Sequence, residues 1–85
     1  MSPPDWRPAI RALLYVVQFA EDPAAAADHA IEVVVDRGAL GVTRDDYRSD
    51  IAAALASGEP LAKLIPQPHP EDSVRLFLGA ILARL

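Results

Sequence analysis

The chain has 85 residues, of which 52% are hydrophobic and none is cysteine. This length accommodates one domain, and the lack of cysteine excludes disulfides and thiolate metal sites. Twelve acidic against eight basic residues give a net charge of −4, which repels nucleic-acid backbones and anionic membrane surfaces. The length therefore predicts a single domain, residues 1–85, which we expect to be helical. The charge predicts that its partner is neither nucleic acid nor a membrane.

The first predicted helix runs from Trp6 to about Glu21, with Asp5 as its N-cap. Its apolar residues recur at helical spacing, and its polar face is narrow. We therefore expect this helix to be the most enclosed element of the fold. Its inward side chains are those of Trp6, Ile10, Leu13, Leu14 and Val17.

The second predicted helix begins at Asp22-Pro23, where aspartate caps the helix and proline takes the first helical position. Gly38 is the expected stop. Three consecutive valines at 33–35 also fit a buried strand, but the helical spacing around them favours a helix. The inward side chains include Ile31, Val34 and Val35.

Asp28, Glu32 and Asp36 lie four residues apart in this helix and form an acidic stripe opposite its apolar face. A row of like charges speeds encounter with an oppositely charged protein. The same charges at i, i+4 spacing weaken a helix slightly. Two interpretations are open, namely a docking face for a basic partner protein and an ordinary solvated helix face.

Two further features define the middle of the chain. Thr43 and Asp46 have the spacing of a capping box, so a third helix begins near Arg44, and Gly58 ends it. A short helical turn is expected within residues 60–65. Alternating prolines from 66 to 70 then predict a stiff, extended, non-helical connector.

The last predicted helix begins at Pro70 and carries acidic residues in its first turn, where they favour the helix dipole. Its apolar stripe is broader than one small core can cover. Leu76 and Leu82 are therefore candidate contact residues, for a homodimer or for a protein partner. The stripe consists of Val74, Phe77, Leu78, Ile81, Leu82 and Leu85, with Leu76 and Ala80 beside it.

These segments predict an all-α fold, a small four-helix bundle with a short extra helical turn before a proline-rich connector. No signal peptide is recognisable at the N-terminus. The longest apolar run is far shorter than the roughly 20 residues of a membrane-spanning helix. We therefore expect a cytoplasmic protein.

Residues 40–48 resemble the turn and recognition helix of a helix-turn-helix motif. Aligning Gly41 with the motif's turn glycine places Arg37 where a small buried residue is needed and Asp50 where an apolar residue is needed. Aspartates at the start of the helix would also face DNA. A transcription regulator stays an alternative to an ordinary junction between helices.

The sequence contains no recognisable catalytic or cofactor-binding pattern. His29 and Glu32 are three residues apart, but in the reverse order of the di-iron Glu-x-x-His pattern, and His69 lies in the connector. No nucleophile elbow surrounds the serines, and the loop glycines are too few for a phosphate cradle. We expect no enzyme activity, no metal and no cofactor.

The predicted function is that of a small, acidic, non-enzymatic protein-binding module. In its most concrete form the protein inhibits a partner protein with a basic surface, in the manner of an immunity protein or an antitoxin. A homo-oligomeric assembly subunit, held together by the last helix, is a further alternative. The predicted contact residues are Asp28, Glu32, Asp36, Leu76 and Leu82.

Overall fold

The computed structural model describes residues 5–37 and 43–85, and these ranges contain four α-helices around one apolar core and no strand. The predicted all-α fold is thereby confirmed. The described elements are α1 (Arg7–Val17), the 3-10 turn η1 (Ala24–Ala26), α2 (Ala27–Ala30), the π-helical segment η2 (Ile31–Val35), α3 (Arg44–Ser57), the 3-10 turn η3 (Leu61–Lys63) and α4 (Glu71–Arg84).

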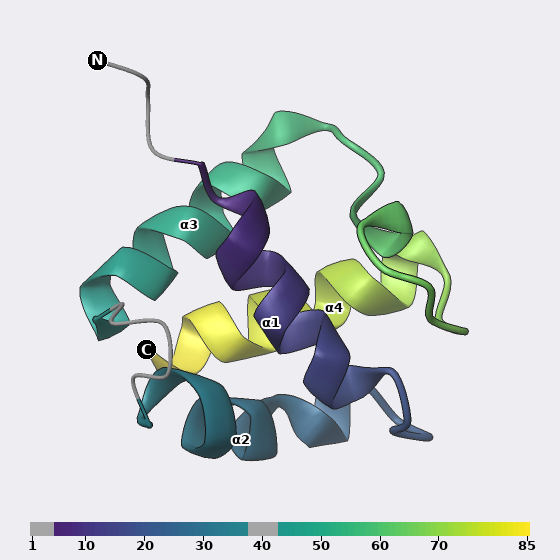
Figure 1. The fold of residues 1–85 in the computed structure, drawn as a ribbon, viewed down its shortest axis with the longest axis horizontal. Coiled ribbons are helices and arrows are strands. Elements are labelled where there is room, and N and C mark those ends of the chain that lie inside the picture. The colour runs from purple at the N-terminus through teal and green to yellow at the C-terminus, as the bar shows by residue number, and fades with distance from the viewer. Residues whose placement is uncertain (1–4, 38–42) are drawn as a thin grey trace.

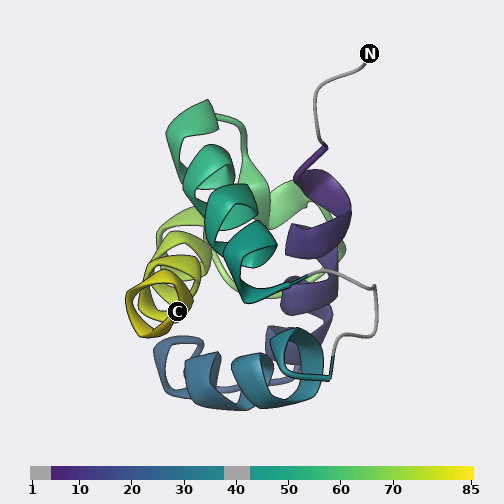
Figure 2. The ribbon, with the colours of Figure 1, turned by 90° about the vertical axis from the view of Figure 1, so that its left-hand side faces the viewer.

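The helices pack so that each covers part of a shared core. α3 packs against α1 and α4, and α2 packs against α4 and α1 (Figure 1). Figure 2 shows α1 on one side of the molecule and α4 on the other, with α2 across the bottom. The sides of α1 and α4 that point away from the core therefore face opposite directions.

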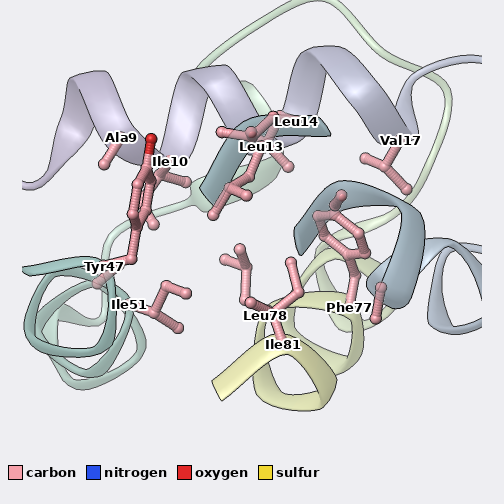
Figure 3. Packing of buried hydrophobic residues seen from close by; sticks show 14 of the residues in the cluster. Ala9, Ile10, Leu13, Leu14, Val17, Tyr47, Ile51, Phe77, Leu78 and Ile81 are labelled. Carbon is pink, nitrogen blue, oxygen red and sulfur yellow. The ribbon is translucent and has the colours of Figure 1, made fainter. Parts of the chain in front are cut away.

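The core is mainly aliphatic, as the composition indicates. Leucines and isoleucines of α1 and α4 meet at its centre, while the Tyr47 ring reaches from α3 toward α1, with its hydroxyl beside Ala9 and Ile10 (Figure 3). Burial of these apolar helix faces supplies most of the stability of such short helices. The largest fully buried side chains are those of Tyr47, Phe77, Ile10, Leu13, Leu14, Ile51, Leu61, Leu78, Ile81, Val17 and Val74.

α1 is shorter than the sequence predicts, because it ends at Val17 rather than near Glu21. The carbonyl oxygen of Val17 does not accept from a further helical turn and has two other partners. The backbone N–H of Ala20 donates to it at 2.9 Å, and Nε2 of His69 lies 3.0 Å from it. α1 begins at Arg7, one residue after the predicted start, and Trp6 rather than Asp5 takes the N-cap position. Oδ1 of Asp5 still accepts a hydrogen bond from the backbone N–H of Arg7 at 3.0 Å.

The second predicted helix is not one uniform α-helix. It begins as the 3-10 turn η1, continues as one α-helical turn and widens into η2, where the backbone N–H of Asp36 donates to the carbonyl of Ile31 at 2.8 Å. β-branched side chains crowd an α-helix, and the wider π turn here carries a run of them with Val34 and Val35 buried. The predicted stop at Gly38 lies outside the described residues.

The predicted caps of α3 are confirmed. The Thr43 hydroxyl accepts from the backbone N–H of Asp46 at 3.1 Å, and the Asp46 carboxylate accepts from the backbone N–H of Thr43 at 3.2 Å. Gly58 ends the helix with φ of 73°, in the left-handed region that favours glycine. The local sequence alone therefore defines both ends of α3.

The connector between η3 and α4 is non-helical, as predicted, but it bends instead of running straight. The side chain of Gln67 accepts from the backbone N–H of His69 at 2.8 Å and donates to the carbonyl of Ala62 at 3.0 Å. These bonds hold the bend against η3. The prolines at 66, 68 and 70 remain exposed on its outer side.

Glu71 joins η3 to the start of α4. Its carboxylate accepts from the backbone N–H groups of Leu61 at 3.0 Å and Ala62 at 2.8 Å, and from Nε of Arg75 at 2.8 Å. Burial acts to raise the pKa of Glu71, but these hydrogen bonds outweigh it, so the pKa lies below its ordinary value. Glu71 therefore holds η3 in place as a carboxylate.

Candidate protein-binding surfaces

The acidic stripe predicted from the sequence lies on the outside of the fold. Asp28 is in α2, Glu32 is in η2 and Asp36 follows η2, and all three side chains are exposed. Four residues exceed one turn of an α-helix but fall short of one turn of a π-helix. Because the helix type changes between Asp28 and Asp36, the three carboxylates do not follow one uniform α-helical spacing.

Two of the three stripe carboxylates are paired with arginines from other helices. Arg44 of α3 donates from Nε to Oδ1 of Asp36 at 2.9 Å and from Nη2 to Oδ2 at 3.2 Å. Nε of Arg84, in α4, lies 2.7 Å from Oδ1 of Asp28. The hydrogen bonds from Arg44 hold the pKa of Asp36 below its ordinary value. The stripe is therefore less negative than the sequence suggests.

Glu32 differs from its two neighbours in the stripe. It is exposed, and among residues 5–37 and 43–85 it forms no ion pair. The charge of the stripe that has no arginine partner within these ranges is therefore at Glu32. Arg44 and Arg84, which pair with its two neighbours, come from other helices, so the spacing of the carboxylates could not reveal them.

The two leucines predicted on the last helix have different surroundings. The side chain of Leu76 is 68% exposed, whereas Leu82 is half-buried and packs against the core. Six residues separate them, which is about one and two-thirds turns of an α-helix, so they leave α4 on different sides. Leu76 therefore lies on the surface, and it does not form one patch with Leu82.

The residues spaced around Leu76 on α4 are one carboxylate and two small residues. Asp72 precedes Leu76 by four residues and is exposed. Gly79 has open space where a side chain would stand, and Ala83 beyond it is exposed. This arrangement places one protruding apolar side chain beside a carboxylate, and Asp72 is a contact candidate that the sequence analysis missed.

The structure also exposes two aromatic side chains that the sequence analysis missed. Tyr15 is 57% exposed and Phe19 is 88% exposed. Tyr15 is in α1, whereas Phe19 lies in the turn that follows the end of α1 at Val17. Because α1 and α4 lie on opposite sides of the molecule (Figure 2), Tyr15 and Leu76 are on different helices at different sides of the fold.

Among residues 5–37 and 43–85, the shifted pKa values that do not come from ion pairs or hydrogen bonds are those of two groups in α3. Burial raises the pKa of Tyr47 and of Asp50, and the charges of Asp46 and Asp5 raise that of Asp50 further. Within residues 5–37 and 43–85 no ligand-sized pocket adjoins them, and no group of three or more acidic or histidine side chains could hold a metal. This edge of α3 offers a shifted carboxyl group without a cavity for a substrate.

The helix that resembled a recognition helix carries arginines that are already engaged. Arg44 binds Asp36, as described above. Arg48 pairs with Asp45 at 2.9 Å and donates to the carbonyl of Leu85. The start of α3 therefore presents paired charges rather than a row of unpaired arginines.

None of the helices in the described part of the chain is both long and apolar enough to cross a membrane. Comparison with protein-family models, with curated proteins and with solved structures gives no match for this chain.

Proposed function

We propose that this chain is a small, acidic, non-enzymatic module that binds a partner protein with a basic surface, in the concrete case an enzyme that it inhibits as an immunity protein or antitoxin does. The observation that carries the proposal is Leu76, a large apolar side chain 68% exposed on α4. One exposed carboxylate, that of Asp72, lies one turn before it. A second, that of Glu32, lies in η2, which continues α2, and α2 packs against α4.

This combination matches the anatomy of protein interfaces. The buried centre of an interface is apolar and its rim is polar, and a few anchors supply most of the binding energy. Leu76 is the proposed anchor. Glu32 and Asp72 have no ion pair within the described ranges, so they are the proposed rim charges that steer a basic partner toward α4.

The paired members of the stripe contribute less to this steering. Asp28 and Asp36 are held by Arg84 and Arg44, and a basic partner must compete with these arginines for them. We therefore assign the main electrostatic role to Glu32. The regulator alternative receives less support, because the arginines at the start of α3 are engaged by Asp36 and Asp45.

A capture experiment with matched variants tests the proposal. Wild type, Leu76→Glu and Ala53→Glu are immobilised and exposed to an extract of the source organism, and bound proteins are identified by mass spectrometry. Ala53 is exposed on α3, so Ala53→Glu adds the same charge on another helix and serves as control.

The proposal expects a protein that wild type and Ala53→Glu retain and Leu76→Glu loses. The purified partner should then carry an activity that the wild-type chain inhibits. The role of this face would be refuted if all three immobilised proteins retained the same set of proteins. It would also be refuted by a specific partner that binds Leu76→Glu as well as wild type.

A further inference from the structure

Two segments that are far apart in the sequence meet at one end of the molecule. The turn after α1 is closed by the hydrogen bond from the backbone N–H of Ala20 to the carbonyl of Val17, and Phe19 is the third residue of this turn. Nε2 of His69, in the proline connector, lies 3.0 Å from the same carbonyl. The turn and the connector therefore lie side by side, at the right of the view in Figure 1.

This contact brings exposed apolar side chains together. Phe19 is 88% exposed, and Pro68 and Pro70, on either side of His69, are exposed as well. Each of these three residues lies within two positions of Val17 or His69, which form the contact. Proline has a fixed φ, so this surface is largely ordered before a partner binds, which lowers the entropic cost of binding. We call Phe19, Pro68 and Pro70 the end patch.

The charged residues that border the end patch are acidic. Residues 18–22 of the turn and residues 66–72 of the connector both end in Glu-Asp, and neither segment contains a lysine or an arginine. Glu21 and Asp72 are exposed and form no ion pair within the described ranges. The end patch is therefore an apolar surface with carboxylates at its edge.

These charges determine which occupant fits. A second copy of this end and an anionic lipid surface would both be repelled by the carboxylates. The nearest basic residues on either side of the connector are Lys63 and Arg75, and Arg75 is already bonded to Glu71. An apolar pocket with basic side chains around its mouth complements both the apolar centre and the acidic edge. We propose that Phe19 of the end patch inserts into an apolar pocket of the partner protein, rimmed by lysine or arginine.

The inference rests on the proposed function for the existence of that partner and adds a second anchor to it. Asp72 lies two residues after Pro70 and four residues before Leu76, so the end patch adjoins the Leu76 face at the start of α4. Phenylalanine is enriched at the centres of protein interfaces. With its greater exposure, Phe19 is the stronger anchor of the two.

A small probe of the same chemistry tests the end patch without the partner. β-Cyclodextrin has an apolar cavity that accepts a phenyl ring, and its rim can carry amino groups or carboxylates. Binding of the amino and carboxylate forms to wild type, Phe19→Ser and Tyr15→Ser is measured by isothermal titration calorimetry at low salt. Tyr15 is an aromatic residue 57% exposed on α1, outside the patch, so Tyr15→Ser is the matched control. Circular dichroism checks that each variant keeps the helical content of wild type.

The proposal expects the amino form to bind wild type at least about threefold more tightly than the carboxylate form. Phe19→Ser should weaken the binding of the amino form at least about tenfold, whereas Tyr15→Ser should leave it unchanged. Glu21→Gln should reduce the preference for the amino form more than Glu32→Gln, which removes an equal charge from η2. Binding that Phe19→Ser retains, or equal effects of the two glutamine variants, would overturn the proposal.

The captured partner separates this inference from the proposed function. A partner that Leu76→Glu loses and Phe19→Ser binds as tightly as wild type would overturn the inference and leave the proposed function intact. A partner that Phe19→Ser loses and Leu76→Glu retains would support the inference and refute the role of Leu76. Self-association of wild type that Phe19→Ser abolishes would assign the end patch to a second copy and overturn the proposal.

Discussion

Replacing Tyr47 by phenylalanine should stabilise the fold. Tyr47 is fully buried between α3 and α1, and its hydroxyl is the one buried side-chain group in the described ranges that has no hydrogen-bond partner. A buried polar group left unsatisfied costs about 1–3 kcal/mol. The Tyr47→Phe variant removes this group and keeps the ring, which touches the core beside Ile10 (Figure 3).

The expected gain follows from two opposing terms. Removing the unsatisfied hydroxyl recovers about 1–3 kcal/mol. The void left by one oxygen atom costs only about 0.3 kcal/mol, taking roughly 24 cal/mol per Å³ of cavity. The free energy of unfolding should therefore rise by about 1 kcal/mol or more, and Tm by roughly 4–8 °C for a domain of this size.

Urea unfolding, followed by circular dichroism and by the fluorescence of Trp6, measures this difference. Tyr15→Phe is the matched control, because it deletes the same hydroxyl at a position that is 57% exposed, where substitutions usually stay within about ±0.5 kcal/mol. A loss of 1 kcal/mol or more in Tyr47→Phe would refute the reasoning, since it would mean that the hydroxyl has a partner.

The same variant changes the alkaline limit of stability. Burial raises the pKa of Tyr47 above its ordinary value of 10.0. Above about pH 10 the unfolded chain therefore loses the phenolic proton while the folded chain keeps it, and stability falls as pH rises. Tyr47→Phe should lack this part of the alkaline loss, whereas Tyr15→Phe should retain it.

Three further predictions concern α4 and the acidic stripe. Glu71→Gln should destabilise the fold by about 1–3 kcal/mol in thermal unfolding at neutral pH. Because the pKa of Glu71 is lowered in the folded state, the difference should shrink as pH falls below about 4.5, and a constant difference would contradict the role of its carboxylate. The double variant Asp28→Lys with Glu32→Lys should lower the free energy of unfolding by no more than about 1 kcal/mol, the usual contribution of an exposed ion pair. It should also slow partner association, and an unchanged association rate at low salt would mean that the stripe is only a solvated helix face. Leu76→Glu should leave Tm nearly unchanged and Leu82→Glu should lower it, because only Leu82 packs against the core; equal effects on Tm would contradict these positions.

The sequence was sufficient for features that depend on neighbouring residues. The capping box of Thr43 and Asp46 and the left-handed Gly58 bound α3 as predicted, because each cap involves residues within one turn. The prediction of α4 from Glu71 onward holds for the same reason. The helical turn η3 lies within residues 60–65, where a short turn was expected.

Features that depend on distant contacts could not be predicted in this way. The early end of α1 involves His69, which is 52 residues away from Val17 in the chain. The pairing of Asp28 with Arg84 joins two helices whose proximity no local pattern encodes. The exposure of Phe19 was missed because the sequence predicts a helix that continues to about Glu21, whereas α1 ends at Val17 and Phe19 lies in the turn after it.

The most direct test of the proposed binding role is the association rate of the captured partner with wild type and with Glu32→Lys, measured at low and at high salt. The account predicts a slower association for Glu32→Lys at low salt, a difference that disappears at high salt, and unchanged folding of the variant. Equal rates at low salt would contradict the assignment of Glu32 as the charge that steers the partner toward α4.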